Sequence, residues 1–375
     1  MDTELNEQIR KTLGMIVDGN LKNNVFTACS VGVIEHNKSS FNTAIFNYGQ
    51  SGKVLGSKPV DNSTLYDLAS LTKPLVTSLC ILALVEKGRL SLTDPVSKYF
   101  DFCGNIGKRI QIIHLLEHTS GLPAHREYYK AYLTFPEKER DVAIVRSISK
   151  EDLTFDPGSS ELYSDLGYVL LGKIVEKIVG EKLDQYWKKT ILGPLRLHKG
   201  LLFTKNHPVK GMVFGTTGRC QWSNKELSGL VNDDNCRLLG GVAGHAGLFG
   251  TADALVQLTS TLLKMYNGSY AHPAISFELM RQALRMKKGR WLLGFDTPSK
   301  PISSSGTYFS DKTIGHLGFT GTSFWLDLEE MRGVILLTNR VLCNEDLTGI
   351  QKFRPTVHDA IQKILTDRKN TNSAC

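Results

Sequence analysis

The chain has 375 residues, of which 41% are apolar and 22% charged, and its formal net charge is +8. This is the composition of a globular protein, long enough to bury a sizeable core in one large domain or two medium ones. The Lys and Arg residues form no run of five or more. We therefore expect a mildly basic surface and no nucleic-acid partner.

The cysteines and the N-terminal segment favour a cytoplasmic location. The seven Cys are odd in number and contain no C-x-x-C pair, which favours reduced thiols. The first residues, MDTELNEQIRKTLGMIVDGN, lack the apolar core of a signal peptide. No stretch approaches the roughly 18 apolar residues of a membrane span. We expect a cytoplasmic protein without a membrane span.

Hydrophobic periodicity predicts the elements in chain order. Residues 4–17 have the spacing of an amphipathic helix, and strands are predicted at Val25–Glu35 and Phe41–Tyr48. An apolar run from Ser70 through Val85 predicts a buried helix. The middle of the chain is mainly helical, with helices predicted over residues 110–118, 138–149, 163–180, 182–192, 251–266 and 275–286. Strands return at Trp291–Phe295, Ser323–Leu328 and Gly333–Thr338, and a last helix follows Pro355.

This grouping predicts the fold class. Strands at both chain ends can pair in one sheet, which makes the helical middle an insertion. We expect an α+β fold with an antiparallel sheet from both chain ends, flanked by helices, and an inserted, mainly helical domain. The predicted sheet domain comprises residues 1–68 and 288–375, and the predicted helical domain comprises residues 69–287. The active site is expected in the cleft between them.

The stretch HLLEH allows one metal-dependent alternative. His114, Glu117 and His118 match the H-x-x-E-H pattern of inverted zinc peptidases. The sequence Thr119–Pro123 that follows predicts a helix end, so that His118 is alternatively a helix-terminal residue. No downstream acidic segment offers a third ligand. A zinc metallopeptidase therefore stays open as an alternative, and no other metal site is expected.

The buried helix begins with a possible nucleophile. Ser70 and Lys73 are three residues apart and share one helix face, and Pro74 falls in the first turn, where a missing N–H costs least. A neighbouring cation and burial lower the pKa of a lysine, and a neutral amine can take the proton of a serine. The S-x-x-K pattern alone is weak, because Ser147 and Lys150 repeat it in a polar stretch.

Further segments add a family resemblance. They are LLEHTSGLP (115–123), FDPGSSELYSDLGYVLLG (155–172), GGVAGHAGLFGTADAL (240–255) and GHLGFTGTSFWLDLEE (315–330). With the Ser70 segment they resemble, in order, the serine β-lactamase and penicillin-binding-protein family. The resemblance spans about residues 20–365 and is closest to the class C-like branch, which includes esterases and D-amino-acid peptidases. It implies the same fold as the element order.

The resemblance implies catalytic roles. Ser70 would be the acylated nucleophile and Lys73 its partner. Tyr163, the first residue of Tyr-Ser-Asp, looks like the family's catalytic tyrosine, which would move protons between Ser70, Lys73 and the leaving group.

The resemblance also implies a binding strand. His316, Leu317 and Gly318 look like the family's third motif on a sheet-edge strand. The backbone N–H groups of Ser70 and Phe319 would form the oxyanion hole.

The chain departs from the family pattern at three positions. Asp165 replaces the usual Asn, and a carboxylate only accepts hydrogen bonds. Near Lys73 it would hold the amine protonated, which shifts the proton-accepting role toward Tyr163. His316 replaces the usual Lys, so we expect weaker and pH-sensitive substrate anchoring. Leu317 removes a hydroxyl. These changes disfavour efficient β-lactam hydrolysis.

We expect a serine hydrolase that acts through a Ser70 acyl-enzyme on a small ester or amide, as an esterase, a D-amino-acid peptidase or a weak β-lactamase. Its substrate would be a small molecule or a peptide, and no cofactor is expected. The alternative from another class is a catalytically silent binder or sensor of acyl-peptides or cell-wall fragments. The sequence gives no prediction of the oligomeric state.

Overall fold

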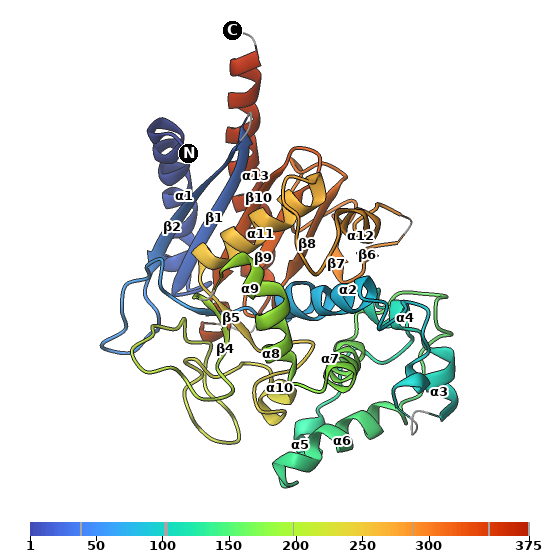
Figure 1. Cartoon of the computed structure of the whole chain (residues 1–375). Coiled ribbons are helices and arrows are strands. Elements are labelled where there is room, and N and C mark those ends of the chain that lie inside the picture. Colours follow the sequence, from blue (N-terminus) through green and yellow to red (C-terminus); the bar gives the residue numbers. More distant parts are fainter. Residues whose placement is uncertain (38–39, 101–103, 198, 288, 344–345, 374–375) are drawn as a thin grey trace.

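The structure is a computed structural model that describes the chain except residues 38–39, 101–103, 198, 288, 344–345 and 374–375. Its main element is an antiparallel sheet with the strand order β2-β1-β10-β9-β8-β7-β6 (Figure 1). The strands are β1 (Ala28–Asn37), β2 (Ser40–Gly49), β6 (Trp291–Leu292), β7 (Phe295–Asp296), β8 (Thr313–Leu317), β9 (Ser323–Asp327) and β10 (Arg332–Thr338). Because β1 pairs with β10, both chain ends meet in one sheet, and the expected α+β fold is confirmed.

The two terminal helices cover one face of the sheet. They are α1 (Thr3–Lys22) and α13 (Thr348–Ser373), which lie side by side in Figure 1. The apolar stripe of α1 packs with Val31 and Val33 of β1. The prediction that the last helix follows Pro355 is wrong, because Pro355 lies inside α13. A proline is a frequent helix boundary, but here the tertiary contacts of α13 override it.

The opposite face of the sheet is covered by α11 (Ala252–Asn267). Gly32 of β1 permits the close approach of this helix, because a Cβ atom there would lie 2.4 Å from Cγ2 of Val256. Burial on both faces explains why β1 reads as a nearly continuous apolar run rather than an alternating one.

The middle of the chain forms most of the helices, as expected. They are α2 (Leu79–Glu86), α3 (Gly104–Arg109), α4 (Ile112–Leu116), α5 (Tyr128–Tyr132), α6 (Glu137–Ile148), α7 (Asp165–Val179), α8 (Leu183–Trp187), α9 (Gly193–Leu195), α10 (Asp234–Leu238) and α12 (Phe277–Ala283). A second, small sheet contains β3 (Tyr66–Asp67), β5 (Leu248–Gly250) and β4 (Leu201–Phe203). The domain boundaries given above stay a prediction.

One described segment is long and apolar enough to cross a membrane by composition alone. It is Ala69–Glu86, with 18 residues and a mean hydropathy of 1.4, and 83% of it is buried inside the protein. The expectation that no stretch approaches this length therefore needs correction. Its burial is typical of the core helix of a globular protein.

Candidate active site

The helix that carries Ser70 changes its geometry along its length. A 3₁₀ turn spans Ala69–Leu71, a π-helical segment spans Lys73–Ser78, and α2 continues to Glu86. Pro74 has no N–H to donate to the carbonyl four residues earlier, which is that of Ser70. The hydrogen-bond ladder therefore loosens at the nucleophile, and π-helical turns of this kind are frequent at functional sites.

The turn before Ser70 is held by a buried carboxylate. Ala69 has a φ of +47°, a left-handed conformation that costs an alanine about 1–3 kcal/mol. Asp67 stabilises it, because Oδ1 accepts a hydrogen bond of 2.9 Å from the Ala69 N–H. Its Oδ2 accepts one of 2.7 Å from the N–H of Asn232, which ties a distant loop to the same turn. Burial raises the pKa of Asp67 to about 6.

Lys73 connects the nucleophile to a second carboxylate. Its Nζ donates to Ser70 Oγ at 2.8 Å and to Asp165 Oδ1 at 2.7 Å, and it lies 3.3 Å from the carbonyl oxygen of His245. The Lys73 side chain is fully buried. The two predicted members of the S-x-x-K pair are therefore in direct contact, and the three donors of the ammonium each have an acceptor.

The ion pair determines the charge of Lys73. Burial alone would lower the pKa of Lys73, but the Asp165 carboxylate, with a smaller contribution from Tyr163, raises this pKa above its usual value. Burial would likewise raise the pKa of Asp165, whereas the Lys73 ammonium and a hydrogen bond from His125 lower it. His125 Nδ1 lies 3.3 Å from Asp165 Oδ2. Lys73 is thus a cation and Asp165 an anion at neutral pH.

Tyr163 lies beside the same ammonium. Lys73 Nζ is 4.7 Å from the centroid of the Tyr163 ring. Burial raises the pKa of the Tyr163 phenol, while the Lys73 charge and hydrogen bonding with Lys73 and Ser70 oppose this rise. Tyr163 is consequently neutral in the resting site, next to the cation that would stabilise its phenolate.

His316 lies on the sheet side of the site, in β8. Its Nδ1 donates to the Leu317 carbonyl oxygen at 2.8 Å, and its ring is 6.0 Å from that of Tyr163. Burial lowers the pKa of His316 to about 3. His316 is therefore neutral through the physiological range in this site, and its role in anchoring a substrate stays a prediction. The expected sheet-edge position is wrong, since β8 pairs with β7 as well as with β9.

Side-chain hydrogen bonds clamp the predicted oxyanion loop to the nucleophile turn. Thr320 Oγ1 donates to the Asp67 carbonyl at 2.6 Å, and Thr322 Oγ1 donates to the Leu68 carbonyl at 3.2 Å. Gly318 packs against the second of these hydrogen bonds, because a Cβ atom at this position would be 2.0 Å from Thr322 Oγ1 and 2.7 Å from the Leu68 carbonyl oxygen. This tight packing holds the segment that carries Phe319 beside Ser70.

One cavity of about 600 Å³ is lined by every predicted site residue except Lys73, which contacts the lining residue Ser70. Its walls include Ser70, Tyr163, Asp165, His316, Gly318 and Phe319. A larger cavity of about 790 Å³, bordered by Trp187 and Phe203, contains none of the predicted site residues. The smaller cavity is therefore the candidate active site, although the role of each residue stays a prediction.

Comparison with known proteins identifies the family. A family model described as Beta-lactamase matches residues 16–350. The chain belongs to the beta-lactamase family. This family member is 32% identical over 330 residues to an N-acetylmuramyl-L-alanine amidase of Bacillus subtilis strain 168. The matched region covers 78% of this chain and 73% of the amidase.

Two solved structures share the fold of this beta-lactamase family member. A class C beta-lactamase is 19% identical, with a TM-score of 0.71 over 94% of this chain and 96% of that chain. EstCE1, described as a hydrolase with promiscuous acyltransferase activity, is 21% identical, with a TM-score of 0.70 over 95% and 99% of the two chains. The resemblance found in the sequence is confirmed, and the protein is a serine hydrolase.

The zinc alternative is not favoured in this beta-lactamase family member. His114 Nδ1 accepts from the Gln111 N–H, and Glu117 pairs with Lys287. His118 is buried against Tyr163, and burial lowers its pKa well below the usual value. Among the residues that the structure describes, no group of three or more His, Cys, Asp or Glu side chains is placed to hold a metal.

The sequence analysis missed several residues of the site. Asp67, which supports the nucleophile turn from β3, lies three residues before Ser70, and His125 lies two residues after the quoted segment 115–123, so both positions could have been examined. His245 lies in the quoted Gly-rich segment but was given no role, and Asp233 carried no signal at all. His125, Asp233 and His245 reach the cavity from loops whose course is set by long-range contacts.

Proposed function

We propose that this serine hydrolase cleaves amides or esters by forming an acyl-enzyme on Ser70. One observation carries the proposal, namely the 2.8 Å hydrogen bond from Lys73 Nζ to Ser70 Oγ inside the cavity. The Ser70 oxygen forms a bond to the carbonyl carbon of the substrate, and the leaving amine or alcohol departs with a proton. Water then hydrolyses the ester.

The charges of the site support Tyr163 as the acceptor of the Ser70 proton. Lys73 is protonated and donates to Ser70 Oγ, so it stabilises negative charge there and does not accept the serine proton. In the fraction of the enzyme whose Tyr163 has already lost its own proton to solvent, the phenolate, whose charge Lys73 balances, accepts the serine proton and then passes it to the leaving group. Asp165 is a positioning residue, because it keeps Lys73 charged and in place.

The oxyanion would be bound by the backbone N–H groups of Ser70 and Phe319. The hydrogen bonds of Thr320 and Thr322 support this arrangement, because they join the two segments rigidly. Such preorganised donors typically stabilise a transition state by about 3 kcal/mol each.

The substrate class is proposed from the site and from the relatives. The relative at 32% identity is named an amidase, and one structural neighbour is described as a hydrolase with acyltransferase activity. Neutral His316 offers no cation for a substrate carboxylate. These points support small amides or esters, including peptide amides, over clinical β-lactams. A cytoplasmic location without nucleic-acid or membrane partners stays a prediction.

Labelling of the nucleophile tests the proposal. Mass spectrometry after treatment with a fluorophosphonate should find one adduct, on Ser70. Ser70→Ala should lose the adduct, whereas Ser147→Ala, which removes the serine of the second S-x-x-K pattern, should keep it. An unlabelled Ser70 in folded wild-type protein would contradict the proposal.

A catalytically silent binder is not favoured, because Ser70, Lys73 and Tyr163 are all present and in contact. Turnover of p-nitrophenyl esters separates the two functions. An enzyme releases p-nitrophenol continuously, whereas a silent family member that only acylates would release one equivalent and stop.

A further inference from the structure

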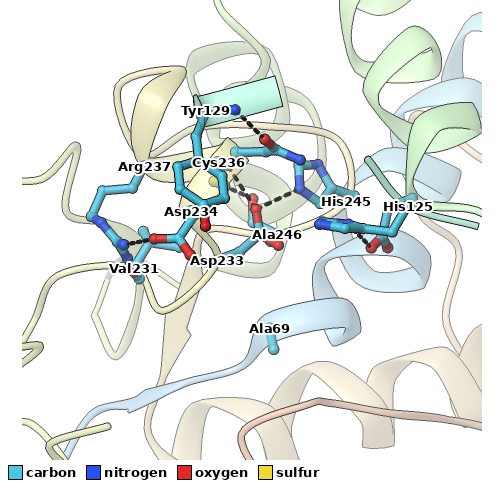
Figure 2. A network of polar contacts seen from close by, with 12 residues as sticks. Ala69, His125, Tyr129, Val231, Asp233, Asp234, Cys236, Arg237, His245 and Ala246 are labelled. Atoms are coloured by element: carbon cyan, nitrogen blue, oxygen red, sulfur yellow. Dashed lines mark hydrogen bonds and ion pairs between the residues drawn. The ribbon is translucent and has the colours of Figure 1, made fainter. Parts of the chain in front are cut away.

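The cavity beside Ser70 has two chemically different walls. One wall, which we name the acid wall, consists of His125, Asp165, Asp233, Asp234 and His245. Figure 2 labels four of these residues, namely His125, Asp233, Asp234 and His245. The other wall contains Arg290 and Arg354 with the end of β8. The two walls face the same nucleophile, so their difference bears on which substrates fit.

Asp233 is a charged and anchored member of the acid wall. Its Oδ1 accepts from the Cys236 N–H at 2.7 Å and from His245 Nε2 at 2.8 Å. Burial would raise the pKa of Asp233, but its interactions with His245 and its hydrogen bond from the Cys236 N–H together lower this pKa, so the carboxylate is ionised. The neighbouring Asn232 is held against the nucleophile turn by Asp67.

His245 holds Asp233 in this wall. Its side chain is 2% exposed, and its carbonyl oxygen lies 3.3 Å from Lys73 Nζ. A carboxylate only accepts hydrogen bonds, so His245 Nε2 carries the proton toward Asp233 Oδ1. The second oxygen, Asp233 Oδ2, accepts no hydrogen bond from the described residues, and the Asp233 side chain is 23% exposed. This oxygen is therefore available to a ligand in the cavity.

The cations of the other wall are engaged by the protein itself. Arg290 donates twice to Asp296, at 2.5 Å and 2.7 Å. Arg354 donates to the carbonyl oxygens of Gly318 and Thr322, at 2.8 Å and 2.9 Å. The carboxylates of the acid wall also have protein partners, since Asp165 pairs with Lys73, Asp233 with His245 and Asp234 with Arg237. The difference is that, within the described part of the chain, Asp233 uses only Oδ1 for its partners, which leaves Oδ2 as an acceptor for a ligand.

We propose that the acid wall binds a free, protonated amino group on the acyl part of the substrate, so that the enzyme prefers unblocked aminoacyl amides and esters. This inference rests on the proposed function. An α-amino group is two bonds from the scissile carbonyl carbon. Asp165 is joined to Ser70 Oγ through the single ammonium of Lys73. The α-amino group of an aminoacyl substrate can therefore contact the acid wall while its carbonyl carbon lies at Ser70.

Binding to an inactive variant tests this inference apart from catalysis. Calorimetry with the Ser70→Ala protein would compare alanine p-nitroanilide with N-acetylalanine p-nitroanilide, for both enantiomers. The two members of each pair differ in the charge and donors of the amine and in the added acetyl group, and the Asp233→Asn comparison below separates the effect of charge from the effect of bulk. We expect the unblocked compound of at least one enantiomer to bind about tenfold more tightly or better, which corresponds to one charge-assisted hydrogen bond.

Two substitutions in the Ser70→Ala background locate the amine. Asp233→Asn should reduce the preference to about twofold, because the amide keeps the acceptor toward Cys236 and His245 but loses the charge. The matched control is Asp311→Asn, which removes the same charge from a side chain that is 82% exposed and should keep the preference.

Three results would overturn the inference. They are equal or tighter binding of the N-acetyl compounds, no binding of either compound at millimolar concentration, and a preference that survives both Asp233→Asn and Asp234→Asn. Failure of the proposed function is a different result, since it is an unlabelled Ser70 in the wild-type protein.

Discussion

Lys73 and His316 are both buried nitrogen bases beside the candidate nucleophile, yet they carry different charges. Burial favours the neutral form of each. Lys73 has the Asp165 carboxylate at 2.7 Å, which raises its pKa, whereas His316 Nδ1 meets only the Leu317 carbonyl, and its pKa falls to about 3. A counter-ion in direct contact therefore decides the charge, and burial decides it where none is present.

The largest expected effect separates the two bases by activity. Lys73→Ala should reduce kcat/KM for a p-nitrophenyl ester by about 10²–10⁴-fold, because it removes the charge that supports Ser70 and Tyr163. His316→Asn should cost about tenfold or less, the value of a neutral hydrogen bond. Steady-state kinetics on both variants, with circular dichroism to confirm folding, measures this. Equal losses of kcat/KM in Lys73→Ala and His316→Asn would contradict the difference in charge between the two bases.

The second prediction concerns stability in acid. His358 resembles His316, since burial lowers its pKa to about 4 while its Nδ1 meets the Ser304 carbonyl. An unfolded histidine has a pKa of about 6.5, so below that pH the unfolded state binds more protons and stability falls as pH falls. Between pH 6.5 and pH 5 each such histidine costs about 2 kcal/mol of unfolding free energy.

His358→Gln should therefore lose about 2 kcal/mol less than the wild type over this pH interval. Urea unfolding at both pH values gives the difference. Contributions of opposite sign, such as that of Asp67 with its raised pKa, occur in both proteins and cancel. Identical losses in the two proteins would show that His358 is not held neutral.

The smallest expected effect is that of His125→Asn. His125 contacts Asp165 at 3.3 Å, but its side chain is 44% exposed, so solvent screens its charge. Its imidazole is also neutral at alkaline pH, where Tyr163 gains its charge. The part of the pH–rate profile at alkaline pH, which follows the ionisation of Tyr163, should therefore move by less than about half a pH unit in His125→Asn. A larger shift of this profile would show that His125 acts as a second counter-ion of Asp165.

The sequence predicted the fold better than the site. Periodicity placed the first helix, the terminal strands and most middle helices, because each buries an apolar face that local spacing reveals. It missed the break of Trp291–Phe295 into the hairpin of β6 and β7, where Leu293 and Gly294 have positive φ values. In the site, Ser70, Lys73 and Tyr163 follow motifs. Asp233 and His245 reach the cavity only through long-range packing, which leaves no local pattern.

The central claim is that Asp165 keeps Lys73 charged, and one measurement tests it most directly. The rate of Ser70 acylation by a p-nitrophenyl ester should be followed against pH in the wild type and in Asp165→Asn. Asp165 raises the pKa of both Lys73 and Tyr163, so its loss should lower both. We predict that the alkaline limb moves at least about one pH unit toward lower pH in the variant. A limb that stays in place, or moves toward higher pH, would contradict the account.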